Sequence, residues 1–171
     1  MAQITSAMAA KYLKKLNEEH EALLRREKKT MAFTAAIQEN KEEVRPEYDY
    51  GTTQEQLLEL ERRIRSIKHE INLFNLNQSV PGFDMTVDQM LVYIPQLTAR
   101  KNKLERMRSR LPRERVQDSY SRNSALVEYE YSNYDIQQAE ADYNKVADEL
   151  ARAQNALDQV NATVSFEVVV E

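Results

Sequence analysis

The fold of this chain is decided by residues 57–74, which read LLELERRIRSIKHEINLF. Apolar side chains recur here at spacings that alternate between three and four residues without a break, at Leu57, Leu60, Ile64, Ile67, Ile71 and Phe74. Such spacing lines up the a and d positions of a heptad repeat on one side of an α-helix. The stretch therefore predicts a long helix, about 53–77, that buries one face against other helices.

A second stretch carries the same unbroken alternation and predicts a helix over about 135–161. Its seam consists of Ile136, Ala139, Tyr143, Val146, Leu150, Ala153, Leu157 and Val160. Two further helices are predicted over about 4–40 and 86–110. Thr86 and Gln89 have the spacing of a capping box at the start of the latter. Pro95 removes a backbone hydrogen bond within it and should kink or interrupt that helix.

Two short strands are predicted, over about 124–132 and 163–170. In the first, apolar and acidic residues alternate, so Tyr129 and Tyr131 are expected to pack into the core with Val127. At 1.5 Å per residue, the helix over 135–161 is about 40 Å long and carries the second strand away from the first. We expect the second strand to pair with a neighbouring chain of a homo-oligomer. A tight parallel pair with the first strand of the same chain is the alternative.

These elements predict a mainly α fold. They indicate an antiparallel four-helix bundle with long coiled-coil-like helices and a small two-strand β element, in a single domain over 1–171. The two glycines and four prolines among 171 residues agree with long helices. The absence of cysteine excludes disulfides and thiolate chemistry and fits a cytoplasmic protein. The net charge of -4 argues against general nucleic-acid binding, and no apolar run is long enough to span a bilayer.

The strongest functional signal is a run of six arginines within the seventeen residues 106–122. Guanidinium groups bind phosphates and carboxylates bidentately, and tyrosine rings stack on planar ligands. The candidate ligand-binding residues are Arg108, Arg113, Arg115, Tyr120, Arg122, Tyr134, Asn72 and Asn75. The arginines inside the helix over 86–110 can instead complement its dipole. The two asparagines can instead cap the turn that follows their helix.

Several short motifs resemble those of the septicolysin-like family of small, mostly uncharacterised bacterial proteins. They are the Pro46–Asp49 loop, Ile71–Asn75, Tyr120–Arg122, and Leu157-Asp158 with Asn161. The resemblance covers most of the chain. It implies an oligomeric helical bundle with a small β element and no established catalysis.

The residues themselves offer little support for an enzyme. No nucleophile elbow or glycine-rich phosphate loop is present, and the two isolated histidines do not form a zinc motif. We therefore expect a non-enzymatic, homo-oligomeric protein that sequesters a small nucleotide-like anion without a cofactor, a metal or a membrane. A viral sponge for host immune nucleotide signals is one such protein. The alternative is a structural or adaptor protein that acts only through protein–protein assembly.

Overall fold

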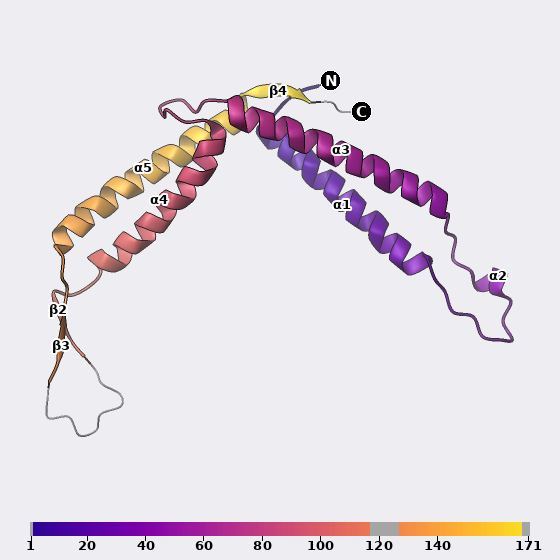
Figure 1. Ribbon diagram of the computed structural model, residues 1–171, viewed down its shortest axis with the longest axis horizontal. Helices are drawn as coiled ribbons and strands as arrows, with labels where there is room; N and C mark the ends of the chain where they lie inside the picture. The colour runs from indigo at the N-terminus through magenta and orange to yellow at the C-terminus, as the bar shows by residue number, and fades with distance from the viewer. Residues whose placement is uncertain (1, 117–126, 169–171) are drawn as a thin grey trace. The chain divides into compact units, whose positions relative to one another are not determined.

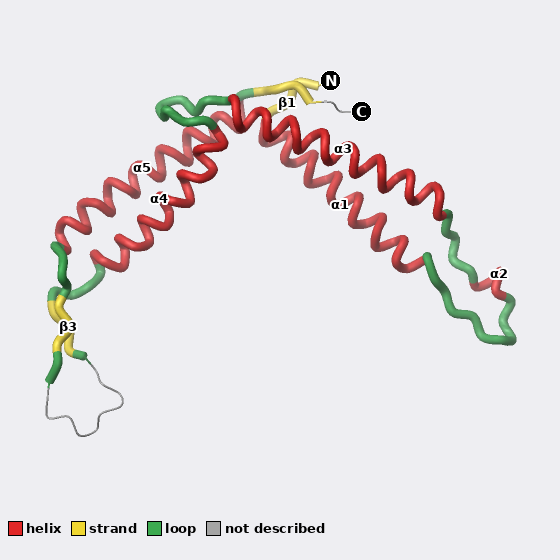
Figure 2. The backbone as a smooth tube through the Cα atoms, viewed as in Figure 1, coloured by secondary structure: helices red, strands yellow, loops and turns green. Residues whose placement is uncertain are grey.

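The computed structural model describes residues 2–116 and 127–168. Its helices are α1 (Ser6–Thr30), α2 (Lys41–Val44), α3 (Tyr50–Asn77), α4 (Val87–Arg108) and α5 (Ile136–Thr163). Its strands are β1 (Ala2–Thr5), β2 (Arg113–Arg115), β3 (Tyr129–Tyr131) and β4 (Ser165–Val168) (Figures 1 and 2). The prediction of a mainly α protein is confirmed. The chain forms two compact units, one up to Gln78 and again from Gln159, the other from Ser79 to Asp158.

In the first unit, α1 and α3 lie side by side and are joined by a connection that contains α2 (Figure 1). The centre of its core is formed by Leu16, Ile67 and Val168, each 1% exposed. Half-buried side chains surround this centre, namely Ile4, Tyr12, Leu13, Leu60, Ile64, Ile71 and Phe166. The stripe predicted along residues 57–74 thus supplies the inner face of α3.

The first predicted helix is shorter than expected. α1 begins after Thr5, whose hydroxyl accepts a hydrogen bond from the Met8 N–H, and it ends at Thr30 rather than near residue 40. Its partner α3 begins only at Tyr50, so a helix over 31–40 would have no apolar face to pack against. Because packing supplies most helix stability in proteins, this stretch forms a loop, in which Ile37 is fully exposed.

The pairing of the C-terminal strand corrects the sequence prediction. β4 pairs antiparallel with β1 of the same chain, with Ala2 opposite Val168 and Ile4 opposite Phe166. The predicted parallel pair with the strand over 124–132 is therefore wrong, and β4 has a partner strand within its own chain, whereas we expected one from a neighbouring chain. β1 was concealed in the sequence because Ile4 also fits the helical stripe that runs on through Met8.

In the second unit, α4 and α5 lie side by side and lead into the strands β2 and β3 (Figure 1). The predicted capping box of Thr86 and Gln89 is present at the start of α4. Pro95 lies inside α4 and does not interrupt it, although a proline cannot donate to the carbonyl of Leu91 one turn earlier. The buried side chains of this unit are Val80, Val87, Met90, Leu97, Ala139, Val146, Leu150, Ala153 and Leu157.

The first unit thus contains α1 and α3, and the second contains α4 and α5 up to Asp158, so the predicted four-helix bundle is not confirmed. Of the seam positions expected at the centre of that bundle, Ile67, Leu150 and Leu157 are buried. Leu60 and Ile64 are only half-buried. A two-helix layer covers one side of each helix, so positions at the margin of the seam keep some exposure.

We predict that Ile67→Ala lowers the free energy of unfolding by about 2–5 kcal/mol, because it leaves a cavity between α1, α3 and β4. Leu58→Ala is the matched control on the same helix, since Leu58 is 64% exposed and its loss should change stability little. Urea unfolding followed by circular dichroism measures both variants. Equal destabilisation by the two substitutions would contradict this description of the core.

Candidate functional site

The arginine run and the tyrosines that follow it meet in a two-stranded antiparallel ribbon. In this β2–β3 ribbon, Arg113 lies opposite Tyr131, Glu114 opposite Glu130, and Arg115 opposite Tyr129. The Val116 N–H donates to the Glu128 carbonyl at 3.0 Å, and the Ser132 N–H donates to the Pro112 carbonyl at 3.1 Å. Hydrogen-bonded and non-hydrogen-bonded pairs alternate in such a ladder, so both Arg–Tyr pairs are of the closely spaced, non-hydrogen-bonded kind.

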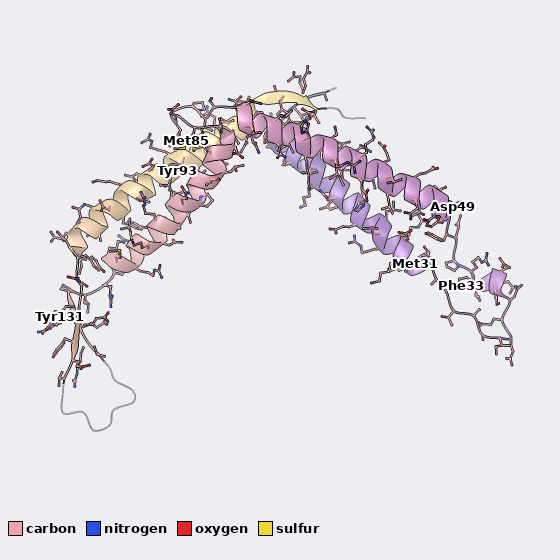
Figure 3. All side chains as sticks on the ribbon, in the orientation of Figure 1. Met31, Phe33, Asp49, Met85, Tyr93 and Tyr131 are labelled. Atoms are coloured by element: carbon pink, nitrogen blue, oxygen red, sulfur yellow. The ribbon has the colours of Figure 1, made fainter. Side chains whose placement is uncertain are left out.

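Directly opposed residues project from the same side of a sheet, so the ribbon has two chemically different faces. Arg113, Arg115, Tyr129 and Tyr131 share one of them, which we call the Arg/Tyr face. Both tyrosines are exposed, Tyr131 by 63%, and its side chain extends outward from β3 in Figure 3. The expectation that these tyrosines pack into a core with Val127 is wrong, because Val127 is exposed as well.

Within the described residues, the two arginines of this face differ in their partners, and neither is paired with a carboxylate. The Arg113 guanidinium lies over the Tyr129 ring, 4.6 Å from its centroid. Within residues 2–116 and 127–168, Arg115 has no ion-pair or ring partner. Glu114 and Glu130 project from the opposite face, where Glu130 contacts Arg110 at 2.7 Å. This hydrogen bond raises the pKa of Arg110. The Arg/Tyr face therefore presents positive charge that these glutamates do not neutralise.

Arg108, the first of the predicted ligand-binding arginines, is held by partners within its unit. Its guanidinium donates to both carboxylate oxygens of Glu105, at 3.0 and 3.1 Å, and lies 3.9 Å from the centroid of the Tyr143 ring. A longer contact of 4.0 Å reaches Glu140. The hydrogen bond with Glu105 raises the pKa of Arg108 and lowers the pKa of Glu105. Arg108 thus fastens α4 to α5.

Tyr134 and Ser132 attach the base of the ribbon to the end of α4. The Tyr134 hydroxyl donates to the carbonyl of Met107 at 2.8 Å, and the Ser132 hydroxyl donates to the carbonyl of Leu111 at 2.9 Å. The Met107 carbonyl belongs to the last turn of α4, where carbonyls lack helical partners. Tyr134 therefore supports the ribbon from its base through its hydroxyl, and the stacking role of its ring stays a prediction.

The other predicted site residues are not part of the Arg/Tyr face as described. Tyr120 and Arg122 lie outside the described residues. Asn72 and Asn75 belong to α3 in the first unit, where Asn72 is exposed and Asn75 half-buried. Of the predicted set, the described face contains Arg113 and Arg115. The sequence analysis did not place Tyr129 and Tyr131 beside these two arginines. Only the pairing of β3 with β2 shows that the tyrosines and the arginines share one face.

Comparisons with known proteins bear on the fold alone. No protein-family model matches the chain, and no curated protein does. A crystal structure titled as a functionally unknown conserved protein from Corynebacterium diphtheriae is similar over 97% of this chain and 100% of its own, with a TM-score of 0.61 and 14% identity. The resemblance to the septicolysin-like family stays a prediction. Among the described residues, no helix is both long and apolar enough to cross a membrane.

The environments of two arginines lead to a stability prediction. Arg108→Ala should lower the melting temperature, because it removes the Glu105 ion pair and the contact with the Tyr143 ring. Arg115→Ala should leave the melting temperature nearly unchanged, since its side chain extends from an exposed strand. Differential scanning calorimetry of the two variants checks this difference. A loss of stability in Arg115→Ala that matches that of Arg108→Ala would contradict it.

Proposed function

We propose that this protein binds a small anionic ligand that carries an aromatic ring, of the nucleotide class, at the Arg/Tyr face. The observation that supports the proposal is the register of the ribbon, which sets Arg113 and Arg115 directly opposite Tyr131 and Tyr129 on one exposed face. Cations and rings alternate there within the close spacing of non-hydrogen-bonded pairs. Arginine can bind a phosphate and tyrosine can stack on a base, so this combination of groups suits a ligand that carries both.

Each residue type has a distinct part in this binding. Arg115, which has no ion-pair partner among the described residues, is the first candidate to clamp a phosphate, because the planar guanidinium donates two parallel hydrogen bonds. Tyr131 offers an exposed ring for stacking. The Arg113 guanidinium and the Tyr129 ring already lie against one another. That contact reduces the freedom that both side chains would lose on binding.

The chemistry of the ribbon favours binding over catalysis. Glu114 and Glu130 project from the face opposite the Arg/Tyr face. A ligand bound to the Arg/Tyr face would therefore contact cations and rings, and not these carboxylates. A general acid or base must lie within hydrogen-bonding reach of the reacting group. A protein that binds a nucleotide in this way without converting it sequesters the ligand, and the function that we propose is therefore capture.

A structural or adaptor function is the second candidate, and the apolar side chains exposed along the same ribbon support it. Leu111 is 60% exposed, Val127 53% and Val116 43%. Apolar groups of this kind on a thin projection suit contact with another protein. In this alternative, the arginines would contribute to a protein interface and would show no preference for ligands with a ring.

Isothermal titration calorimetry against mononucleotides, cyclic dinucleotides and inorganic phosphate tests the proposal. We expect a nucleotide to bind more tightly than phosphate, and Arg115→Ala to weaken its binding by about tenfold to a hundredfold. Arg115→Lys should recover only part of that loss, because lysine keeps the charge without the fork. Tyr131→Ala should weaken the binding of the nucleotide but leave the binding of inorganic phosphate unchanged.

Arg106→Ala is the matched control, since Arg106 is an exposed arginine of the same run that belongs to α4 and not to β2 or β3. It should leave nucleotide binding unchanged. Binding that no variant of the ribbon alters would refute the placement of the site. Failure of every nucleotide to bind, with the fold intact by circular dichroism, would refute the proposed function and favour the adaptor.

A further inference from the structure

In the ribbon that carries the Arg/Tyr face, some backbone hydrogen-bonding groups of β3 have no partner strand among the described residues. The ladder bonds of Val116 with Glu128 and of Ser132 with Pro112 fix which residues of β3 turn their backbone toward β2. By the alternation of the ladder, Glu130 also faces β2, whereas the N–H and C=O groups of Tyr129 and Tyr131 point away from it. In the described part of the chain, no third strand joins this edge.

A ribbon of two strands is marginally stable in water and gains from further strands. The described β2–β3 ribbon leaves Leu111, Val116, Val127, Tyr129 and Tyr131 all exposed. It is attached at its base by the hydrogen bonds of Ser132 and Tyr134. Its outer edges consequently combine unpaired backbone groups with aromatic and apolar side chains, which is the combination that recruits another strand.

The two edges of the ribbon differ in charge. The outward backbone groups of β2 belong to Arg113 and Arg115. Pairing of β2 with a second β2 would bring arginines of the two chains together, and like charges across a ladder are destabilising. The outward groups of β3 belong to two tyrosines, residues that favour strands and form favourable aromatic pairs across a ladder. β3 is therefore the edge suited to pairing.

We infer that β3 pairs antiparallel with β3 of a second copy of this chain, about a twofold axis, to give a four-stranded sheet. A strand edge is complementary to itself in this arrangement, because the N–H and C=O groups of each copy bond those of the other. Such an interface is isologous and closes after two chains. The outward residues of one β3 then oppose outward residues of the other, so tyrosines meet across the axis.

Glu130 is the charged residue of β3, and its charge is already offset. Arg110 of the same chain contacts its carboxylate at 2.7 Å on the face opposite the tyrosines. Where two copies of Glu130 approach each other near the axis, each carboxylate is therefore already paired with Arg110 of its own chain. Pairing also keeps both Arg/Tyr faces on one side of the enlarged sheet, since opposed residues share a face.

Proline substitution tests the role of the backbone. Tyr131→Pro and Tyr131→Ala both remove the ring, but only proline removes the outward N–H, and neither removes a bond between β2 and β3. By sedimentation analysis of the full chain, we expect the wild type to form dimers and Tyr131→Pro to dimerise about tenfold or more weakly than Tyr131→Ala. A wild type that stays monomeric over the accessible concentrations overturns the inference. Equal dissociation constants for the two variants also overturn it.

Amide hydrogen exchange by NMR locates the interface independently. The Glu130 N–H, which faces β2, should be protected from exchange at every protein concentration. The N–H groups of Tyr129 and Tyr131 should become protected only as the concentration rises through the dimerisation range. Dimers in which these two amides exchange as fast as in dilute solution would place the interface elsewhere and overturn the inference.

Discussion

The first unit depends on the ladder between β1 and β4, which joins the first described residues of the chain to the last. This ladder brings Val168 into contact with the core that Leu16 and Ile67 form between α1 and α3. It also places the Phe166 ring on that of Phe74, with 4.6 Å between the centroids. Two long helices packed only against each other would leave this end of their seam open to water. The ladder closes it, at the cost of ordering only four residues in each strand.

The sequence was informative wherever a pattern repeated over several turns. The seams of 57–74 and 136–160 predicted the helices that became α3 and α5, and the start of α4 followed from Thr86 and Gln89. The strands β1 and β2 were not predicted because they are too short to show a period, whereas β3 and β4 lie within the predicted strands over 124–132 and 163–170. The end of α1 was predicted wrongly for another reason. Local propensity continued past Thr30, and only the late start of α3 left that stretch without a packing partner.

In the candidate site, too, some features could be predicted from residue types along the chain, whereas others depend on the pairing of strands. A run of arginines indicated anion binding, but residue type could not separate arginines held by neighbours from those that remain available. Arg108 lies against Tyr143 and Glu105, and Arg110 against Glu130, whereas Arg115 has no such partner among the described residues. Tyr129 and Tyr131 were interpreted as core because alternation identifies faces without showing whether anything covers them. The register with β2 supplied the missing relation.

The ladder of β1 with β4 also makes the order of elements in this protein circular. Ala2 lies opposite Val168, so the two ends of the described chain are neighbours in space. A short linker could join them, and the chain could be reopened in the exposed connection around Ile37, between α1 and α2. Such a circular permutant would begin at α2 and end with α1 while keeping every helix and strand. The spatial arrangement of the helices and strands thus does not require the order in which they follow one another along the chain.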